Sequence, residues 1–166
     1  MSEFVLTPQE GKSVWLGGLG VDFKLASEQT GGSFSIVEHP IDPGIIVPPH
    51  THTREDEFSY VLEGEVGARI GDQVLLGTPG CYIIKPRGIL HTFWNAGTTR
   101  ARLIEIISPA GLEKFFAEMA QLFQGDGPAD FEKLTQLANG YGCTLDMNWV
   151  PELTAKYNLK LMGQAS

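Results

Sequence analysis

An all-β fold with a helical appendage at its C-terminal end is predicted by three features of this sequence. Short runs of β-branched and aromatic residues dominate the first 109 positions, and a helical period appears only after them. The 166 residues include 20 Gly and 10 Pro, which favours many short strands joined by tight turns over a bundle of helices. Many strands at short spacing indicate a sandwich or a barrel.

The predicted strands lie at residues 33–38, 45–47, 58–62, 66–70, 82–85, 91–94 and 102–107. Turn sequences separate them, among them Asp42-Pro43-Gly44 and Gly71-Asp72. We expect residues 1–109, with some strands near the N-terminus, to form the barrel.

The helical appendage is predicted over residues 110–166. Within residues 111–124 the large apolar side chains recur at helical spacing, at Leu112, Phe115, Phe116, Met119 and Phe123. A second helix is expected from near Pro128 to about Ala138, where two glycines follow, and a short third one over residues 151–157. We expect this segment to pack on the barrel.

Charge and hydropathy exclude some classes of partner. The formal net charge is -8 and no basic cluster occurs, which argues against binding to a phosphate backbone. No run approaches the roughly 18 apolar residues that a membrane-spanning helix needs. The first residues lack a positive start followed by an apolar run, so no secretory signal is expected. Cys81 and Cys143 share no motif, and we expect both to be reduced in a cytoplasmic protein.

Three of the four histidines form one pattern with a glutamate. His50 and His52 are two residues apart, and such residues on a strand project to the same face, so both imidazoles reach one point. Glu57 follows after four intervening residues, enough to round a turn, and residues 86–88 form a turn that returns the chain to His91. Three imidazoles and a carboxylate suit one divalent transition metal, Fe, Mn, Ni, Co, Cu or Zn. Four protein ligands leave a coordination position open, as catalytic sites do.

These residues lie in two motifs that resemble those of the cupins. Gly44-x5-His50-x-His52-x4-Glu57-x6-Gly64 is similar to the first cupin motif at each fixed position. Gly80-x5-Pro86-x-Gly88-x2-His91-x3-Asn95 is similar to the second. The resemblance implies a double-stranded β-helix, the jelly-roll barrel of cupins. It also implies that His50, His52, Glu57 and His91 hold the metal, and that the chain forms a homodimer through its sheets.

Several alternatives stay open within this pattern. In a barrel that has lost its metal, the three histidines would be hydrogen-bonded polar residues, and in a shifted register Asp56 would replace Glu57. His39, at a predicted strand end, is expected at the surface. Asn95 is expected to tie down a turn through its amide, with a contact to a metal ligand as the second interpretation.

The expected function is that of a metal-dependent cupin similar to the small quercetin-dioxygenase-like oxygenases. Glu57 would act as a metal ligand and also accept a proton from the substrate. Ile46, Val61 and Phe93 predict an apolar pocket for a small hydrophobic or aromatic molecule. The alternatives are a cupin that binds a small molecule without catalysis, and a metal-dependent lyase or isomerase, because a fold does not settle function. Strand alternation places Phe58, Tyr60 and Leu62 opposite Glu57, on a face expected to meet a second copy.

Overall fold

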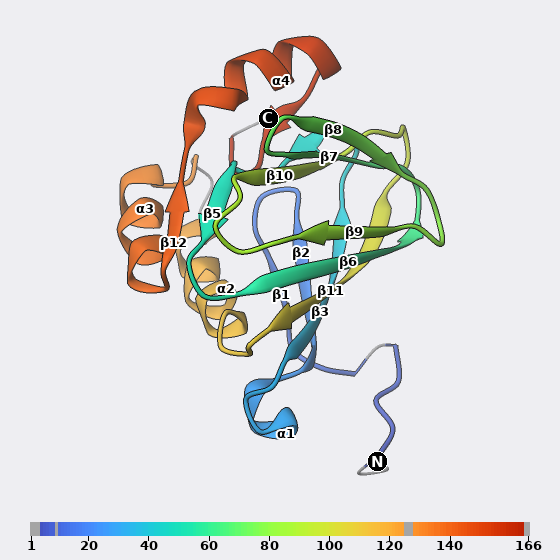
Figure 1. Cartoon of the computed structure of the whole chain (residues 1–166), viewed down its shortest axis with the longest axis vertical. Coiled ribbons are helices and arrows are strands. Elements are labelled where there is room, and N and C mark those ends of the chain that lie inside the picture. The colour runs from blue at the N-terminus through green and yellow to red at the C-terminus, as the bar shows by residue number, and fades with distance from the viewer. Residues whose placement is uncertain (1–3, 9, 125–127, 165–166) are drawn as a thin grey trace.

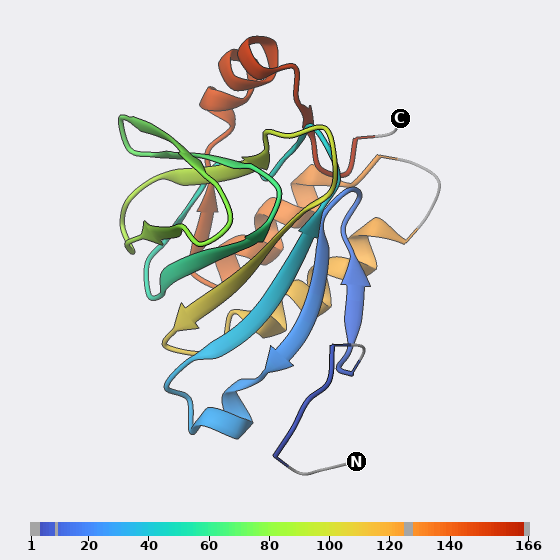
Figure 2. The same ribbon diagram turned by 90° about the vertical axis from the view of Figure 1, so that its right-hand side faces the viewer.

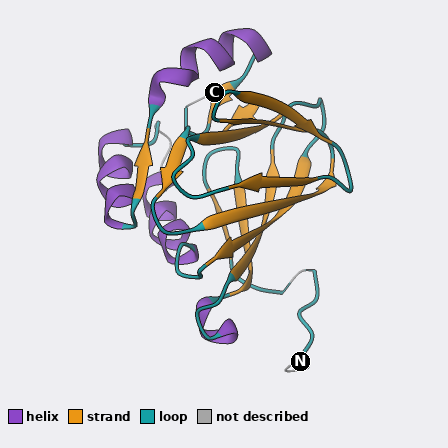
Figure 3. Cartoon of the chain, in the orientation of Figure 1, coloured by secondary structure: helices purple, strands orange, loops and turns teal. Residues whose placement is uncertain are grey.

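The protein is a β-barrel made of two sheets, flanked by helices from its C-terminal part (Figures 1 and 3). The computed structural model describes residues 4–8, 10–124 and 128–164. Across the first sheet the strand order is β1 (Ser13–Trp15), β2 (Gly20–Leu25), β3 (Ser35–Ile41), β11 (Ala101–Ser108), β6 (Asp56–Glu63) and β9 (Tyr82–Lys85). The order across the second is β12 (Cys143–Leu145), β5 (His50–His52), β10 (His91–Asn95), β4 (Ile45–Ile46) and β13 (Lys160–Leu161). A hairpin of β7 (Val66–Ile70) and β8 (Gln73–Gly77) pairs with β10.

Strand alternation builds the interior of the barrel. Buried residues alternate with partly exposed ones along β3 and along its antiparallel neighbour β11. Val37 and Leu103, from these strands of the first sheet, belong to the same buried cluster as Ala68 and Phe93 of the second sheet. Two facing sheets that share one core confirm the predicted barrel.

The helices of the C-terminal part lie at the left side and at the top of the barrel in the view of Figure 1. The periodic apolar residues of the segment 111–124 form α2 (Glu113–Met119), which continues as the 3-10 turn η1 (Ala120–Phe123). The second predicted helix is α3 (Phe131–Gly140), where the Asp130 side chain caps the first turn by accepting from Lys133 N. The third is α4 (Val150–Tyr157), preceded by the 3-10 turn η2 (Met147–Trp149). Among the described residues no helix is long and apolar enough to cross a membrane.

The C-terminal part also adds strands to the barrel, which the sequence pattern did not indicate. β12 pairs with β5 in antiparallel register, so that Cys143 lies opposite His52. β13 pairs with β4 in parallel register. Figure 2 shows this part returning to the barrel after α3. The C-terminal part therefore contributes β12 and β13 to the second sheet in addition to its helices. Strands of two or three residues leave no periodic signal in the sequence.

Candidate metal centre

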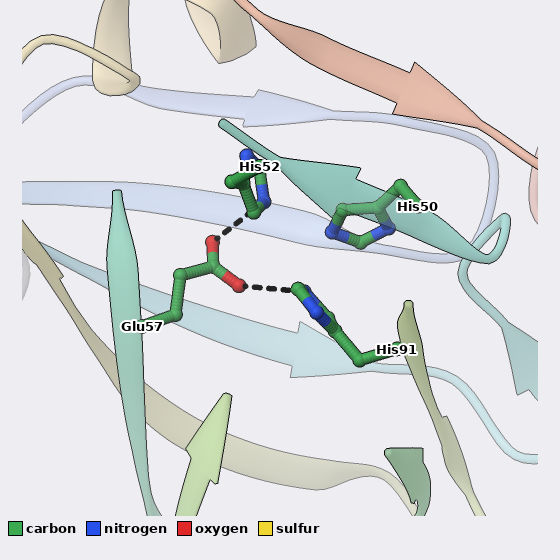
Figure 4. Close-up of side chains that lie close together, drawn as sticks. All are labelled: His50, His52, Glu57 and His91. Carbon is green, nitrogen blue, oxygen red and sulfur yellow. Dashed lines mark ion pairs between the residues drawn. The ribbon is translucent and has the colours of Figure 1, made fainter. Parts of the chain in front are cut away.

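The structure brings His50, His52, Glu57 and His91 together inside the barrel (Figure 4). Each offers one ligand atom, and these four atoms lie within 4.8 Å of one another. The two histidines of β5 point to one side, and β10 places His91 directly opposite His50 in the antiparallel register. Glu57 comes from β6 of the other sheet, so the cluster joins both sheets.

A glycine at the turn before β10 ties the loop to the ligand strand. Gly88 has a φ of 76°, in the left-handed region that favours glycine, and its backbone N–H donates to the carbonyl of His52 at 2.8 Å. The chain then enters β10 with His91 facing the cluster. The turn expected at residues 86–88 therefore positions His91 beside the other two histidines.

Backbone carbonyls fix the orientation of two imidazoles. His50 Nδ1 lies 2.7 Å from the Pro48 carbonyl, and His91 Nδ1 lies 2.8 Å from the Ile89 carbonyl. A carbonyl only accepts, so each Nδ1 carries the proton and each Nε2 keeps its lone pair. Metal-bound histidines in proteins are held by this same kind of contact.

Unpartnered nitrogens show that the cluster fits a metal ion. Among the described residues, both ring nitrogens of His52 and the Nε2 of His91 are buried without a hydrogen-bond partner. Buried polar atoms in native proteins are almost always satisfied, so such a group calls for an explanation. A metal cation bound by the lone pairs of the imidazoles and by the Glu57 carboxylate would explain these unpartnered nitrogens.

Burial keeps the imidazoles of His50 and His52 neutral. It lowers the pKa of His50 well below its ordinary value, and the neighbouring His91 and His52 add to this effect. Burial likewise lowers the pKa of His52, against the opposing effect of Glu57. Neutral imidazoles are the form that binds metals, so the site is ready for a cation at neutral pH.

Glu57 is ionised although it is fully buried. Burial alone would raise its pKa, but the Lys85 ammonium, the largest opposing influence, holds that pKa well below the ordinary value. Lys85 Nζ lies 3.2 Å from Glu57 Oε2, while His91 Nε2 and His52 Nε2 lie 3.3 and 3.5 Å from its two oxygens. The carboxylate is therefore available as an anionic ligand.

Three charged residues around the cluster were not singled out by the sequence. Lys85 and Glu105 form a buried ion pair beside Glu57, with 2.5 Å between Nζ and Oε2. The buried Glu55 places Oε2 3.9 Å from His52 Nδ1, the nitrogen that has no hydrogen-bond partner. Inward-facing charges on β9 and β11 break the apolar pattern of a barrel strand, and this break is the signal that could have identified Lys85 and Glu105.

Asp56, the alternative carboxylate, lies outside the cluster. Its two oxygens accept from the Arg87 side chain at 3.1 and 2.7 Å, and one of them also accepts from the Arg87 backbone at 2.8 Å. The side-chain hydrogen bonds to Arg87 lower the pKa of Asp56 to about 2. Neighbouring residues on a strand point to opposite faces, so β6 directs Glu57 inward and Asp56 outward.

A partly enclosed cavity of about 50 Å³ adjoins the cluster. His50, His52 and Glu57 line it on one side, and Phe115, Phe116 and Met119 of α2 line it on another. The helix α2, together with Leu134 of α3, thus covers the barrel next to the candidate metal site.

Only one of the three expected pocket residues lines this cavity. Phe93 does so, from the same strand as His91. Ile46 instead packs in a separate cluster with Trp94 and Leu161, because β4 directs it to the outer face, beneath α4. Val61 is buried in the main core, away from the cavity.

His39 and Asn95 have clear roles in the structure. The surface position expected for His39 is wrong: its side chain is buried, lines the cavity and packs edge-on against Phe116. It lies in the middle of the inward row of β3, which extends further than the predicted strand. The expectation for Asn95 is confirmed, because its amide donates to the carbonyls of Ile41 and Thr99 and accepts from Gly97 N.

Comparisons with known proteins agree with this architecture. Residues 38–107 match the cupin domain family. Germin-like protein subfamily T member 2 of Arabidopsis thaliana is 39% identical over 67 residues, and nectarin-1 of Nicotiana plumbaginifolia is 40% identical over 67 residues. The matched segment is 37% of this chain in both cases, but only 30% and 29% of those proteins. The chain therefore spans under a third of the curated relatives it matches.

Solved structures resemble the chain in fold. KdgF from Halomonas sp. superposes with a TM-score of 0.60 at 18% identity, over 68% of this chain and 99% of that one. A predicted oxalate decarboxylase from Thermotoga maritima gives 0.60 at 19% identity, over 64% and 99%. An RmlC-like cupin from Shewanella frigidimarina gives 0.56 at 23% identity, over 68% and 96%. With a matching family sequence over residues 38–107, both cupin motifs and this barrel, the chain contains a domain of the cupin superfamily.

Proposed function

We propose that this chain is a metal-dependent oxygenase acting on a compact, largely apolar small molecule. The observation that supports the proposal best is that the cluster of four ligand atoms lines a partly enclosed, mainly apolar cavity. Structural metal sites surround their ion fully, whereas catalytic sites keep a position for substrate.

The proposed ligands are His50, His52, Glu57 and His91, which would hold one divalent transition metal. Their donor types suit Fe, Mn, Ni, Co, Cu and Zn without choosing among them. Such an ion, when bound, would supply Lewis acidity and, if redox-active, the activation of dioxygen. The protein residues would orient the substrate, exclude water and receive its proton.

Glu57 is the proposed proton acceptor as well as a ligand. Its carboxylate is ionised at neutral pH because the Lys85 ammonium stabilises the charge. A substrate whose hydroxyl or enol group lies against the cluster would find this base within the shared cavity. Phe93 and the residues of α2 exclude water, which strengthens each electrostatic interaction in the site.

The cavity limits the size of the substrate. The space inside the cavity is small, about 50 Å³. A flavonol is far larger than that, so the proposed substrate is a compact molecule such as the enol of a short 1,3-diketone. A larger ligand would require α2 to move away from the barrel.

Oxygen uptake tests this function directly. Metal-free protein is reconstituted separately with Fe, Mn, Ni and Co and mixed with pentane-2,4-dione or with quercetin. We expect oxygen consumption with the diketone and a redox-active metal, and a loss of at least about a hundredfold in Glu57→Gln, since a general base contributes that much. Saturable binding of the diketone without oxygen uptake would instead indicate a binding protein that does not catalyse.

A homodimer is proposed through the outer face of the first sheet. In the antiparallel pair of β6 and β9, Phe58 lies opposite Ile84 and Tyr60 opposite Tyr82. Tyr82 is 72% exposed and Ile84 59% exposed, on a strand at the edge of the sheet. Exposed apolar patches of this kind mark protein contacts, and a second copy of the same patch is the proposed partner. A cytoplasmic location is also proposed, and both cysteines are free thiols in the structure, as that location requires.

A further inference from the structure

Glu105 is a buried carboxylate, and one of its two oxygens accepts no hydrogen bond from the described residues. It projects inward from β11, is 1% exposed and lines the same cavity as the ligand cluster. Its Oε2 accepts from Lys85 Nζ at 2.5 Å and from the Ser59 hydroxyl at 2.9 Å. Its Oε1 is buried and has no hydrogen-bond partner among the described residues. An acceptor that is fixed in place and left unsatisfied beside a cavity is suited to a ligand.

His39 offers a second acceptor to the same cavity. Its Nδ1 donates to the Gly20 carbonyl at 2.8 Å, which leaves the Nε2 lone pair as an acceptor. Burial lowers the pKa of His39 to about 4, so the ring is neutral at neutral pH. Phe93 and Phe116, which also line the cavity, lie with ring centroids 6.1 and 5.6 Å from that of the imidazole.

Lys85, the buried hydrogen-bond donor next to Glu105, already contacts two carboxylates. The Lys85 ammonium contacts Glu57 and Glu105, and it lies 4.7 Å from the centre of the Phe93 ring. The cavity walls beyond the ligand cluster, Glu105 and His39 are mainly apolar, including Leu19, Val47, Met119 and Leu134. Apart from the Cys143 thiol, which is a weak donor, the free polar atoms offered to a ligand away from the metal cluster are therefore acceptors.

We propose that Glu105 and His39 form a subsite that selects ligands bearing a hydroxyl or enol hydrogen, so that a hydroxy acid is preferred over the corresponding oxo acid. This inference rests on the proposed function, because the other end of the ligand would reach the metal cluster. Lys85 and Ser59 are positioning residues, which hold Glu105 with one oxygen free. The ligand class is a compact hydroxylated anion or enol.

Lactate and pyruvate test the subsite, because they share a carbon skeleton and differ in a hydroxyl against a carbonyl. Their binding to the Zn²⁺-loaded protein is measured by calorimetry at about pH 8, where Glu105, whose pKa burial raises to about 7, is ionised. Glu105→Gln replaces an anionic acceptor by an amide that also donates. We expect the preference for lactate over pyruvate to fall by about tenfold in this variant, the effect of one hydrogen bond to a charged group.

Two further variants make the result decisive. Glu65→Gln, at an exposed position, should keep the ratio of the two dissociation constants unchanged. His39→Phe keeps an aromatic ring, removes the second acceptor, and should lower the ratio severalfold even if Glu105→Gln fails to fold. An unchanged ratio in the folded variants, or no binding of either acid by the unmodified protein in the millimolar range, would overturn the subsite.

Metal content, determined on the same samples, separates this proposal from the proposed function. If zinc loads and the ratio does not respond to Glu105 or His39, the subsite is wrong and the metal site stands. If zinc does not load, the proposed function fails, and the two acids are compared on the metal-free protein. The subsite still predicts a lactate preference there that Glu105→Gln reduces, and its absence would contradict the inference.

Discussion

Lys85 Nζ lies 3.2 Å from Glu57 Oε2, and this ammonium has no exposed surface. The same nitrogen contacts Glu105 at 2.5 Å, so one buried cation serves two buried carboxylates. One of those carboxylates belongs to the candidate metal cluster and the other to the proposed subsite. Lys85 is therefore the cation shared by the candidate metal cluster and the proposed subsite.

Replacing Lys85 should destabilise the protein strongly. Lys85→Met leaves two buried carboxylates without their cation, and breaking a buried ion pair by removing one partner costs about 3–5 kcal/mol. We expect the free energy of unfolding of the metal-free protein to fall by about that amount in urea denaturation.

A surface pair at the same distance provides the control for Lys85. Lys114 Nζ lies 3.2 Å from Glu28 Oε1, but both side chains are more than half exposed. Lys114→Met should change the free energy of unfolding by less than about 1 kcal/mol, because water screens the pair. Equal losses in the two variants would show that burial of Lys85 does not determine its contribution.

Stability of the metal-free protein should depend on pH through His39. Its pKa is about 4 in the folded chain against 6.5 ordinarily, so the unfolded chain binds more protons between these values. The free energy of unfolding therefore falls as pH drops from 6.5 towards 4, by on the order of 3 kcal/mol from this residue, and the contribution is fully present above 6.5. His39→Phe should show a shallower loss over that window in denaturation curves at stepwise pH. Identical slopes would mean that His39 is not buried as a neutral ring.

The cover formed by α2 should be tightly packed. Phe116 is 8% exposed and lines the cavity, so Phe116→Ala should cost about 3 kcal/mol of unfolding free energy and enlarge the space beside the metal cluster. The variant should also admit ligands that the unmodified protein excludes. Ile89→Ala, at a side chain 41% exposed, should change stability by less than about 1 kcal/mol. A Phe116 variant as stable as this control would show that α2 does not close the barrel.

The dimer proposed on the first sheet is tested by charge. The double variant Tyr82→Lys with Ile84→Lys places two cations on the proposed patch and should sediment as a monomer of about 18 kDa. Val74→Lys with Leu76→Lys, on the exposed strand β8, should leave the dimer intact. A monomer of the unmodified chain at tens of micromolar would remove the interface.

The sequence predicted the parts of the fold that have a period or a motif. The alternation in β3 and β11, the apolar spacing in α2 and the fixed positions of the two cupin motifs each repeat or fall at set distances. The four residues that the structure brings together are those the motif spacing indicated. Periodicity and motif spacing therefore predict an element or a site correctly where the local sequence determines which way the side chains point.

Features that depend on distant segments were not predictable in this way. β12 forms only because α3 returns the chain to the edge of β5, and three residues leave no local signal. Ile46 lies outside the cavity because β4 has just two residues, so its facing is set by packing against Trp94. The pairing of Lys85 with Glu105 joins residues 20 positions apart through the strand between them. Tertiary contacts decide such cases, and a single sequence does not display them.

Metal content of the protein, purified without a histidine tag, tests the central claim most directly. We predict about one equivalent of a divalent transition metal per chain by elemental analysis, and its loss in the double variant His52→Ala with His91→Ala, which removes two of four ligands. The control His39→Phe, outside the ligand cluster, should retain the metal. Circular dichroism should show the double variant still folded, because the apolar core spans both sheets. A full metal equivalent retained in the double variant, or none in the unmodified protein after reconstitution, would contradict the account.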